Sequence, residues 1–517
     1  MFLGLLFLAS SLYAGFAAAK RLAVLDSLAK KLSLGFLLGF AVQTFFILAI
    51  SWLFGALSSE LVMASSLLFF LAGFKLQPQH PARYSKSVSK SELLALAFAL
   101  LFLALHLFAA LRPTETGVEG VISVWGDYPL HLGIASSFAF GSNFPPEYPI
   151  LAGEPLKYSF AMDFASAILL KGGFGLRSSL VIPNVLVFLA LAMAVVLLTE
   201  LVGGRKKAFA LTAMVLLLFF LNGNAGIGFA FQDALQEKSL SPLTVPEKNY
   251  SNLEDKNIVL MNFLYSIFLP SRSALLGFAI AVFLYALLFS NVLERKWRKE
   301  ELFAGGVLAG LLPLAHAQSF LAVGVVAGCL FLLCEKKKEW LYFAVPAALV
   351  ALPQVAWLWG RFPFSKQVGW VAAEKTLGGI VVFWLENGWA LLLGFFAWAA
   401  IAWVKKDRKM LVFSIPFFLL FIMGNVALFQ PWAWDNTKIF LHFFLFASIA
   451  TALFLSGLLE SKKFGAASKA IVAAIFFLSI ASGILALFWV SWGDNARYEV
   501  FSKKDFVLAE WVRKNTP

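Results

Sequence analysis

The sequence predicts an all-α protein, a bundle of about 12–14 transmembrane helices with large external loops. Hydrophobic residues make up 61% of the 517 residues, and charged residues only 14%. The apolar residues fall in runs of membrane-spanning length, since a helix of roughly 20 residues crosses the hydrocarbon core. A water-soluble chain of this length has no way to bury so much apolar surface, so the composition places the protein in a membrane.

Each apolar run is expected to be one helix. The two runs around Pro313 are short for helices that cross the whole membrane, so the sequence does not define their boundaries sharply. The expected helices lie near 2–19, 33–57, 61–76, 93–111, 178–203, 208–222, 258–292, 302–313, 317–334, 340–359, 378–404, 410–429, 438–459 and 468–491.

Short loops rich in lysine and arginine fall on one side of this arrangement. They are 20–31, 75–92, 204–207, 294–301, 335–339, 405–409 and 461–469. The positive-inside rule makes that side cytoplasmic and predicts a multi-pass protein of the cell membrane with its amino terminus outside. These loops also account for the net charge of +13, so no nucleic-acid partner is expected.

The opposite, external side carries the polar loops 112–163 and 223–257. Loop 112–163 is dense in ionisable residues and interrupts an otherwise apolar chain, and such density in a membrane protein needs a reason. Within it, Gly126-Asp127-Tyr128-Pro129 is typical of a helix start, with Asp127 as N-cap and His131 one turn on, on the same face. Asp127 then either only caps a helix, or serves as a general base or as a ligand of a divalent ion such as Mg²⁺ or Mn²⁺. Glu154 and Asp163 are the further candidate catalytic carboxylates of this loop.

Five segments together resemble a branch of the GT-C superfamily of integral-membrane glycosyltransferases. They read VWGDYPLHLG, NFPPEYPILAGEPLKYSFAMDF, FLPSRSALLG, LPLAHAQSF and QPWAWDNTKIF, and the resemblance covers roughly residues 93–445, with the first two segments the most specific. It implies a GT-C-like fold and an inverting transfer on the external face. The donor would be a sugar linked to dolichyl or undecaprenyl phosphate, and the acceptor a lipid, a glycan or a protein.

The resemblance also implies that an acidic residue of the first large outer loop is the catalytic centre, which maps onto Asp127. Tyr128 follows it where a second acidic residue often stands in this superfamily, so metal-dependent and metal-independent transfer both stay open. Members often carry a soluble external domain after the last span. We therefore expect a transmembrane domain at 1–491 and an external amphipathic tail at 492–517, as the start of such a domain.

A lipid phosphate must meet cations at the outer interface. The outer-side candidates inside or beside apolar segments are Lys157, Arg272, Arg361 and Lys438, of which Arg272 and Lys438 stand at span starts, where helix amides also favour anions. The alternative for each is a side chain that only extends to lipid headgroups. His316, in the break between two short runs, is expected to line the donor cavity or to be a polar packing residue.

Tyr128 and Tyr158 are candidates for stacking on a sugar ring, or else belong to the aromatic belt of a membrane protein. Asp435 and Asn436 interrupt two spans, and are candidates for substrate binding. A simple structural explanation for Asp435 is an ion pair with Lys438 on the same helical face.

Two other functions remain open. A secondary transporter or lipid flippase fits the span count, but such proteins usually place charges near mid-membrane in two related halves, which this sequence does not show. An oligosaccharyltransferase-like enzyme is favoured only by Trp434-Asp435-Asn436, which faintly resembles the acceptor motif of that family.

Overall fold

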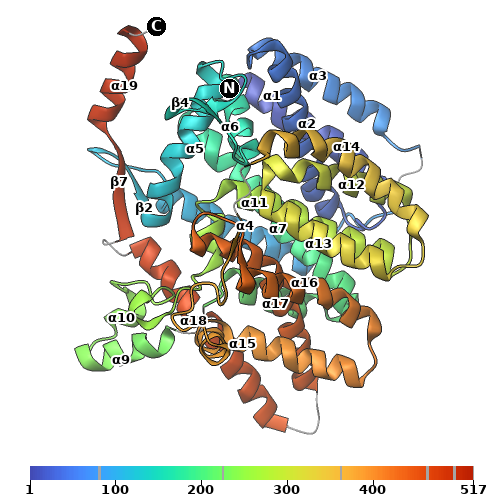
Figure 1. Cartoon of the computed structure of the whole chain (residues 1–517), viewed down its shortest axis with the longest axis vertical. Coiled ribbons are helices and arrows are strands. Elements are labelled where there is room, and N and C mark those ends of the chain that lie inside the picture. The colour runs from blue at the N-terminus through green and yellow to red at the C-terminus, as the bar shows by residue number, and fades with distance from the viewer. Residues whose placement is uncertain (80–82, 224–225, 361–363, 461–464, 493–495, 516–517) are drawn as a thin grey trace.

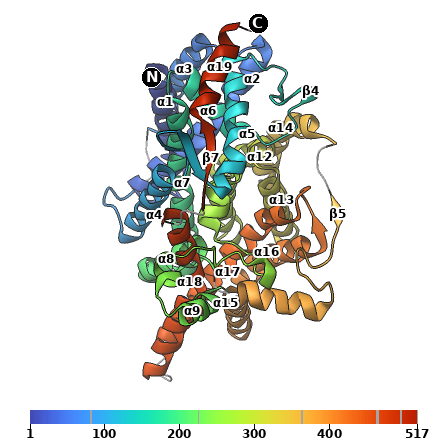
Figure 2. The ribbon, with the colours of Figure 1, turned by 90° about the vertical axis from the view of Figure 1, so that its left-hand side faces the viewer.

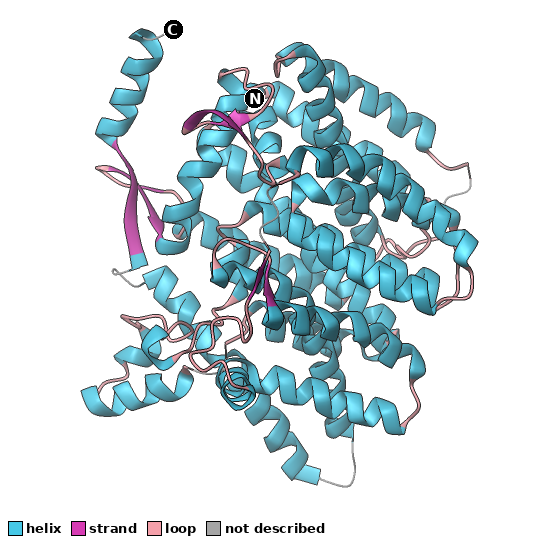
Figure 3. Ribbon diagram, viewed as in Figure 1, coloured by secondary structure: helices cyan, strands magenta, loops and turns pink. Residues whose placement is uncertain are grey.

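The chain folds as an all-α polytopic helix bundle, with a few short strands at its edge (Figure 1; Figure 3). The structure is a computed structural model that describes residues 1–79, 83–223, 226–360, 364–460, 465–492 and 496–515. Eleven helices within these residues are long and apolar enough to cross a membrane. They are α1 (Phe2–Ala19), α2 (Leu28–Phe54), α3 (Ser59–Leu76), α4 (Lys90–Phe108), α7 (Leu176–Gly203), α11 (Arg272–Leu288), α14 (Leu341–Leu358), α15 (Leu377–Val404), α16 (Arg408–Val426), α17 (Thr437–Glu460) and α18 (Gly465–Trp492).

The core of the bundle surrounds α11, which is buried along its whole length, and α17 is nearly as enclosed. Hydroxyl side chains mark several helix starts: Ser27, Ser58, Ser89 and Thr376 each accept a hydrogen bond from a backbone N–H of the first turn. Such caps satisfy amides that would otherwise lack a partner at the helix end.

Three shorter helices complete the fourteen expected segments: α8 (Ala208–Phe220), α12 (Lys299–Ala315) and α13 (Ala317–Leu333). A single extended residue, His316, separates α12 from α13. The chain entering α12 and the chain leaving α13 meet at one end of the bundle, where Arg295 pairs with Glu335 at 3.4 Å. Helices α12 and α13 therefore form a helical hairpin with His316 at its turn.

The span expected at 258–292 begins later than predicted. Its regular helix, α11, starts only at Arg272, after the π-helical turn η3 (Leu264–Phe268) and Pro270. Proline has no N–H and disrupts a continuing helix, so the apolar residues before it pack as irregular chain.

Six of the seven basic loops lie at one end of the bundle, in agreement with the sequence, as judged from their described residues; residues 461–464 of the seventh, 461–469, lie outside the described residues. The strand-like bridge between Ser27 and Ser85 joins the first two loops, and the buried carboxylate of Glu301 accepts from the backbone N–H of Val24 at 2.8 Å. Ion pairs link the others: Arg205 with Asp26, Lys207 with Glu460, Lys409 with Glu294, and Arg295 with Glu335. We call this end the basic end.

The opposite end, called the site end, carries the strands and the other α-helices. Strand β7 (Arg497–Ser502) pairs antiparallel with β2 (Gly117–Val121), which pairs with β1 (Arg112–Pro113), so the tail joins the first polar loop (Figure 2). This pairing was not predicted. The tail then forms α19 (Lys503–Asn515), the helix that its sequence indicates.

The other site-end helices are α5 (Ile122–Phe140), α6 (Ala161–Lys171), α9 (Ile227–Glu237) and α10 (Ser241–Thr244). The hairpin β3 (Glu147–Tyr148) and β4 (Leu151–Pro155) leads from α5 to α6. The short elements left are β5 (Ser365–Lys366), β6 (Ala427–Leu428), η1 (Arg205–Lys207), η2 (Glu254–Lys256), η4 (Phe289–Leu293), η5 (Lys337–Trp340) and η6 (Ala433–Asn436).

Candidate active site

A polar cavity of ≈ 240 Å³ opens at the site end, where α5 meets the starts of α11, α13 and α17. It collects residues that are more than 300 positions apart in the chain, from Asp127 to Lys438. Its lining is Asp127, Leu130, Lys157, Tyr158, Ser159, Ser271, Ser273, His316, Ala317, Gln318, Leu358, Phe429, Gln430, Asp435 and Lys438. The structure therefore brings six of the sequence-predicted site residues together: Asp127, Lys157, Tyr158, His316, Asp435 and Lys438.

Asp127 does not cap a helix, so that expectation is wrong. Helix α5 begins at Ile122, with Val121 as N-cap, because the residues before Asp127 continue the helix and Pro129 is tolerated inside it. The Asp127 side chain is exposed at the cavity, and among the described residues it has no hydrogen-bonding or ion-pair partner. Desolvation by the protein around it raises the pKa of Asp127, and His131 and Lys438 oppose this shift.

Beneath Asp127, one turn further along α5, His131 is buried. Its Nδ1 donates to Asp163 Oδ2 at 2.9 Å, and the other oxygen of Asp163 accepts from Arg272 Nη1 at 2.5 Å. Arg272 is fully buried, and its remaining groups donate to Ser166 Oγ at 2.6 Å and Asn184 Oδ1 at 3.1 Å. Arg272 and Asp163 thus form a buried ion pair below the cavity and do not line it.

Tyr128 belongs to the same buried network. Its hydroxyl donates to the backbone oxygen of Leu269 at 2.9 Å and accepts from Asn184 Nδ2 at 3.2 Å. His106 completes the network, with Nδ1 donating to Phe102 O at 3.0 Å and Nε2 accepting from Asn184 at 3.1 Å. These bonds tie α4, α5, α7 and α11 together and leave Tyr128 turned away from the cavity.

Two lysines line the cavity. Lys438 pairs with Asp435 at 3.1 Å, three residues apart, which confirms the local ion pair that the sequence indicated. Lys157 donates to the backbone oxygen of Trp359 at 2.8 Å, an interaction that leaves its charge without a carboxylate partner among the described residues. The cavity therefore holds two ammonium groups and two carboxylates.

His316 presents one ring nitrogen without a partner. Its Nδ1 accepts from the backbone N–H of Ser319 at 3.3 Å, so in the neutral ring the proton sits on Nε2. Nε2 is buried and has no hydrogen-bonding partner among the described residues. A buried N–H donor at a polar cavity costs free energy unless a ligand accepts its hydrogen bond.

Sequence reasoning missed the hydroxyl groups of the site. Ser271 and Ser273 flank Arg272 and line the cavity at the start of α11, which has no side-chain cap. The sequence feature that could have identified these two serines is their position on either side of Arg272, a predicted phosphate-binding cation at the start of a span. Ser159 donates to Pro313 O at 3.0 Å and accepts from the N–H of Ala317 at 3.2 Å, which holds the loop before α6 against the turn between α12 and α13.

Other predicted residues lie elsewhere. Glu154 lies in β4, outside the cavity lining. Asn436 is buried and bonds the backbone of Phe429, Gly424 and Ala427, so it fixes the loop before α17. Arg361 lies outside the described residues.

The cavity carries two carboxylates, Asp127 and Asp435. Across the described part of the chain, no three histidine, cysteine, aspartate or glutamate side chains gather closely enough to hold an ion. Asp435, the second carboxylate of the cavity, is already paired with Lys438.

Comparison with known proteins leaves the family open. The chain matches no protein-family model and no curated protein. Among solved structures it is similar to the oligosaccharyltransferase of Archaeoglobus fulgidus in complex with Zn and sulfate, at a TM-score of 0.36 and 15% identity. The similarity covers 83% of this chain but 55% of that one, and a TM-score this low carries no argument about activity.

Proposed function

We propose that the chain is a membrane glycosyltransferase that moves a sugar from a polyprenyl phosphate to an acceptor hydroxyl on the external face. One observation carries this proposal. A carboxylate that has no hydrogen-bonding or ion-pair partner among the described residues, Asp127, shares a polar cavity at the site end with Lys157 and Lys438. A general base and a phosphate-binding pair of cations are the two groups such a transfer requires.

The chemistry assigned to the cavity is a displacement at the sugar. The acceptor oxygen forms a bond to C1 as its proton passes to Asp127, and the bond from C1 to the phosphate oxygen breaks. The electron pair leaves with the polyprenyl phosphate, whose charge Lys438 and Lys157 neutralise. Attack opposite the leaving group inverts the configuration at C1.

Helix starts support phosphate binding at the same place. Lining residues come from the first turns of α11, α13 and α17, which begin at Arg272, Ala317 and Thr437. Helix amino termini carry partial positive charge and unpaired N–H groups, which favour anions. His316 Nε2–H adds one side-chain donor for a phosphate oxygen or a sugar hydroxyl.

An apolar groove beside the cavity suits the chain of a lipid donor. It has a volume of ≈ 610 Å³, lies between α2, α12 and α14, and includes Leu314 and Trp357. Trp357 donates to the backbone oxygen of Leu156, the residue before Lys157, at 3.1 Å. A lipid tail in this groove therefore brings its phosphate close to the cations.

The depth of the cavity favours transfer over transport. His316 follows α12, which starts at the basic end and is about 25 Å long at about 1.5 Å per residue. The hydrocarbon core is about 30 Å thick, so the cavity lies nearer to the interface at the site end than to the bilayer midplane. Transporter sites lie near the bilayer midplane.

Binding of undecaprenyl phosphate to the purified, reconstituted chain tests the donor class without knowledge of the sugar. Lys157→Ala and Lys438→Ala should each weaken binding by at least about tenfold, since a charged hydrogen bond contributes roughly 1.5–3 kcal/mol. Lys256→Ala, which removes an exposed lysine outside the cavity, is the matched control. Binding of a nucleoside diphosphate in place of undecaprenyl phosphate, or equal losses in all three variants, would refute the proposal.

A further inference from the structure

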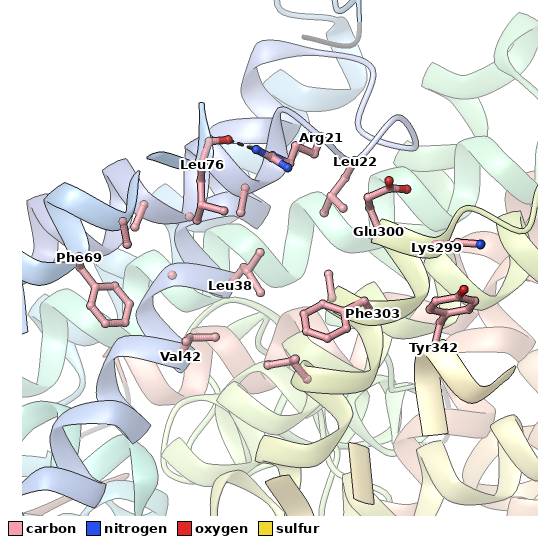
Figure 4. A pocket seen from close by; sticks show the side chains of 17 residues that line it. Arg21, Leu22, Leu38, Val42, Phe69, Leu76, Lys299, Glu300, Phe303 and Tyr342 are labelled. Atoms are coloured by element: carbon pink, nitrogen blue, oxygen red, sulfur yellow. Dashed lines mark hydrogen bonds between the residues drawn. The ribbon is translucent and has the colours of Figure 1, made fainter. Parts of the chain in front are cut away.

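A second, apolar groove lies at the basic end, far along the bundle from the cavity. It has a volume of ≈ 650 Å³ and separates α1, α2 and α3 from α12 and α14. Figure 4 shows Phe69, Leu38, Val42 and Phe303 along its walls. Small residues widen it where the helices face one another: Ala14, Gly15, Ala18, Gly39, Ala72 and Ala304.

Charged groups stand along one rim of this groove. Arg21, Lys299 and Glu300 lie above the apolar walls in Figure 4. Arg21 Nε donates to the backbone oxygen of Leu76 at 2.9 Å, which fixes the side chain and leaves its two Nη groups without a partner in the described chain. Lys299 Nζ lies 4.8 Å from the centre of the Tyr342 ring. Two cations against one carboxylate leave the rim positive.

The length of the groove matches one leaflet of a bilayer. Its wall on α12 runs from Lys299 to Val307, about 12 Å at about 1.5 Å per residue. Half of the hydrocarbon core is about 15 Å thick. A lipid whose headgroup meets the rim can therefore lay an acyl chain along the walls.

We propose that this groove holds one anionic phospholipid of the leaflet at the basic end, with its headgroup at the rim that Arg21 and Lys299 make positive. Two observations favour this occupant. The walls are apolar and about one leaflet long, which a free anion does not need, and the rim is positive, which a neutral acyl lipid does not need. Basic pockets between spans at the cytoplasmic side are where anionic headgroups bind. This inference does not depend on the proposed transfer reaction.

Native mass spectrometry of the full chain with dioleoyl phosphatidylglycerol and dioleoyl phosphatidylcholine tests it, because the two lipids share their acyl chains. The wild-type chain should retain phosphatidylglycerol about fivefold more tightly, because two cations at about 1 kcal/mol each, less a similar opposing effect of Glu300, leave about 1 kcal/mol. Arg21→Ala with Lys299→Ala should abolish this preference. Ala304→Trp, which fills the groove, should weaken retention of both lipids.

The matched control is Lys338→Ala with Lys405→Ala, which removes two exposed lysines of the same end that do not line the groove. It should keep the wild-type preference, and millimolar inorganic phosphate should not displace the lipid. The proposal would be overturned if the control pair lost the preference for phosphatidylglycerol as the groove variants do, or if the wild-type chain showed no such preference. It would also be overturned if phosphate displaced the lipid, or if a second copy of the chain bound in place of lipid.

Discussion

Two aspartates of the first polar loop have opposite environments, and this difference assigns their roles. Asp163 is buried and held by His131 and Arg272, so it is a structural ion-pair partner beneath the site. Asp127 faces the cavity with no partner among the described residues. The carboxylate that remains free to accept a proton is the better candidate for catalysis.

Arg272→Ala should destabilise the fold, because it leaves Asp163 buried with one partner fewer. Breaking a buried ion pair by removing one member typically costs about 3–5 kcal/mol. Thermal unfolding of the purified chain measures the loss. Arg112→Ala removes an exposed arginine of the same end and should change stability by less than about 0.5 kcal/mol. Equal unfolding temperatures for the two variants would contradict the buried-pair assignment.

At the scale of single elements, the turn between α12 and α13 positions the His316 imidazole at the cavity. The turn packs against α11 at Gly277, where any added Cβ would clash with the Cβ of His316. Glycine is therefore required at this point for α11 to pass so close to the turn. The two hydrogen bonds of the Ser159 hydroxyl hold the other side of the same turn.

Gly277→Ala should displace His316 and reduce both stability and donor binding. Overpacking a well-filled site costs roughly 1–3 kcal/mol. Gly324→Ala on α13 is the matched control, since a Cβ there meets nothing within 4 Å. Unfolding temperature and undecaprenyl phosphate binding should fall for Gly277→Ala only. Identical behaviour of the two variants would show that the close packing of α11 does not position the turn.

At the scale of the whole molecule, the two ends of the bundle differ in chemistry. Ion pairs among the basic loops mark one end, and the cavity, the sheet and the tail mark the other. The positive-inside rule predicts that the basic end is cytoplasmic. Each end has one proposed lipid site, and each site is a groove between helices that do not pack tightly against one another. Helix α11 fills the centre of the bundle between them.

Single cysteines test the orientation in a chain whose native Cys329 and Cys334 have been replaced. Ser142→Cys and Ser239→Cys, both exposed at the site end, should react with an impermeant thiol reagent added to intact cells. Ser87→Cys and Lys405→Cys, exposed at the basic end, should react only after permeabilisation. The reverse pattern would place the cavity inside the cell.

The sequence patterns predicted the features of this structure that depend on residues close together in the chain. Every expected apolar run contains a helix, and the Asp435–Lys438 pair follows from helical spacing. The start of α5 was misplaced because Gly-Asp-Tyr-Pro resembles a helix start even inside a helix. The burial of Arg272 depends on helices that meet only in the folded bundle, and the pairing of β7 with β2 joins segments nearly 400 residues apart. Local periodicity contains no information about such contacts.

The most direct test of the central claim is the rate of sugar transfer from a polyprenyl phosphate donor by Asp127→Asn. Asparagine keeps the size of the side chain but accepts no proton at neutral pH, so the variant should fold, bind undecaprenyl phosphate as the wild type does, and lose transfer by at least about 100-fold. The exposed Asp255→Asn is the control and should transfer normally. Transfer at near wild-type rate by a folded Asp127→Asn chain would contradict the account.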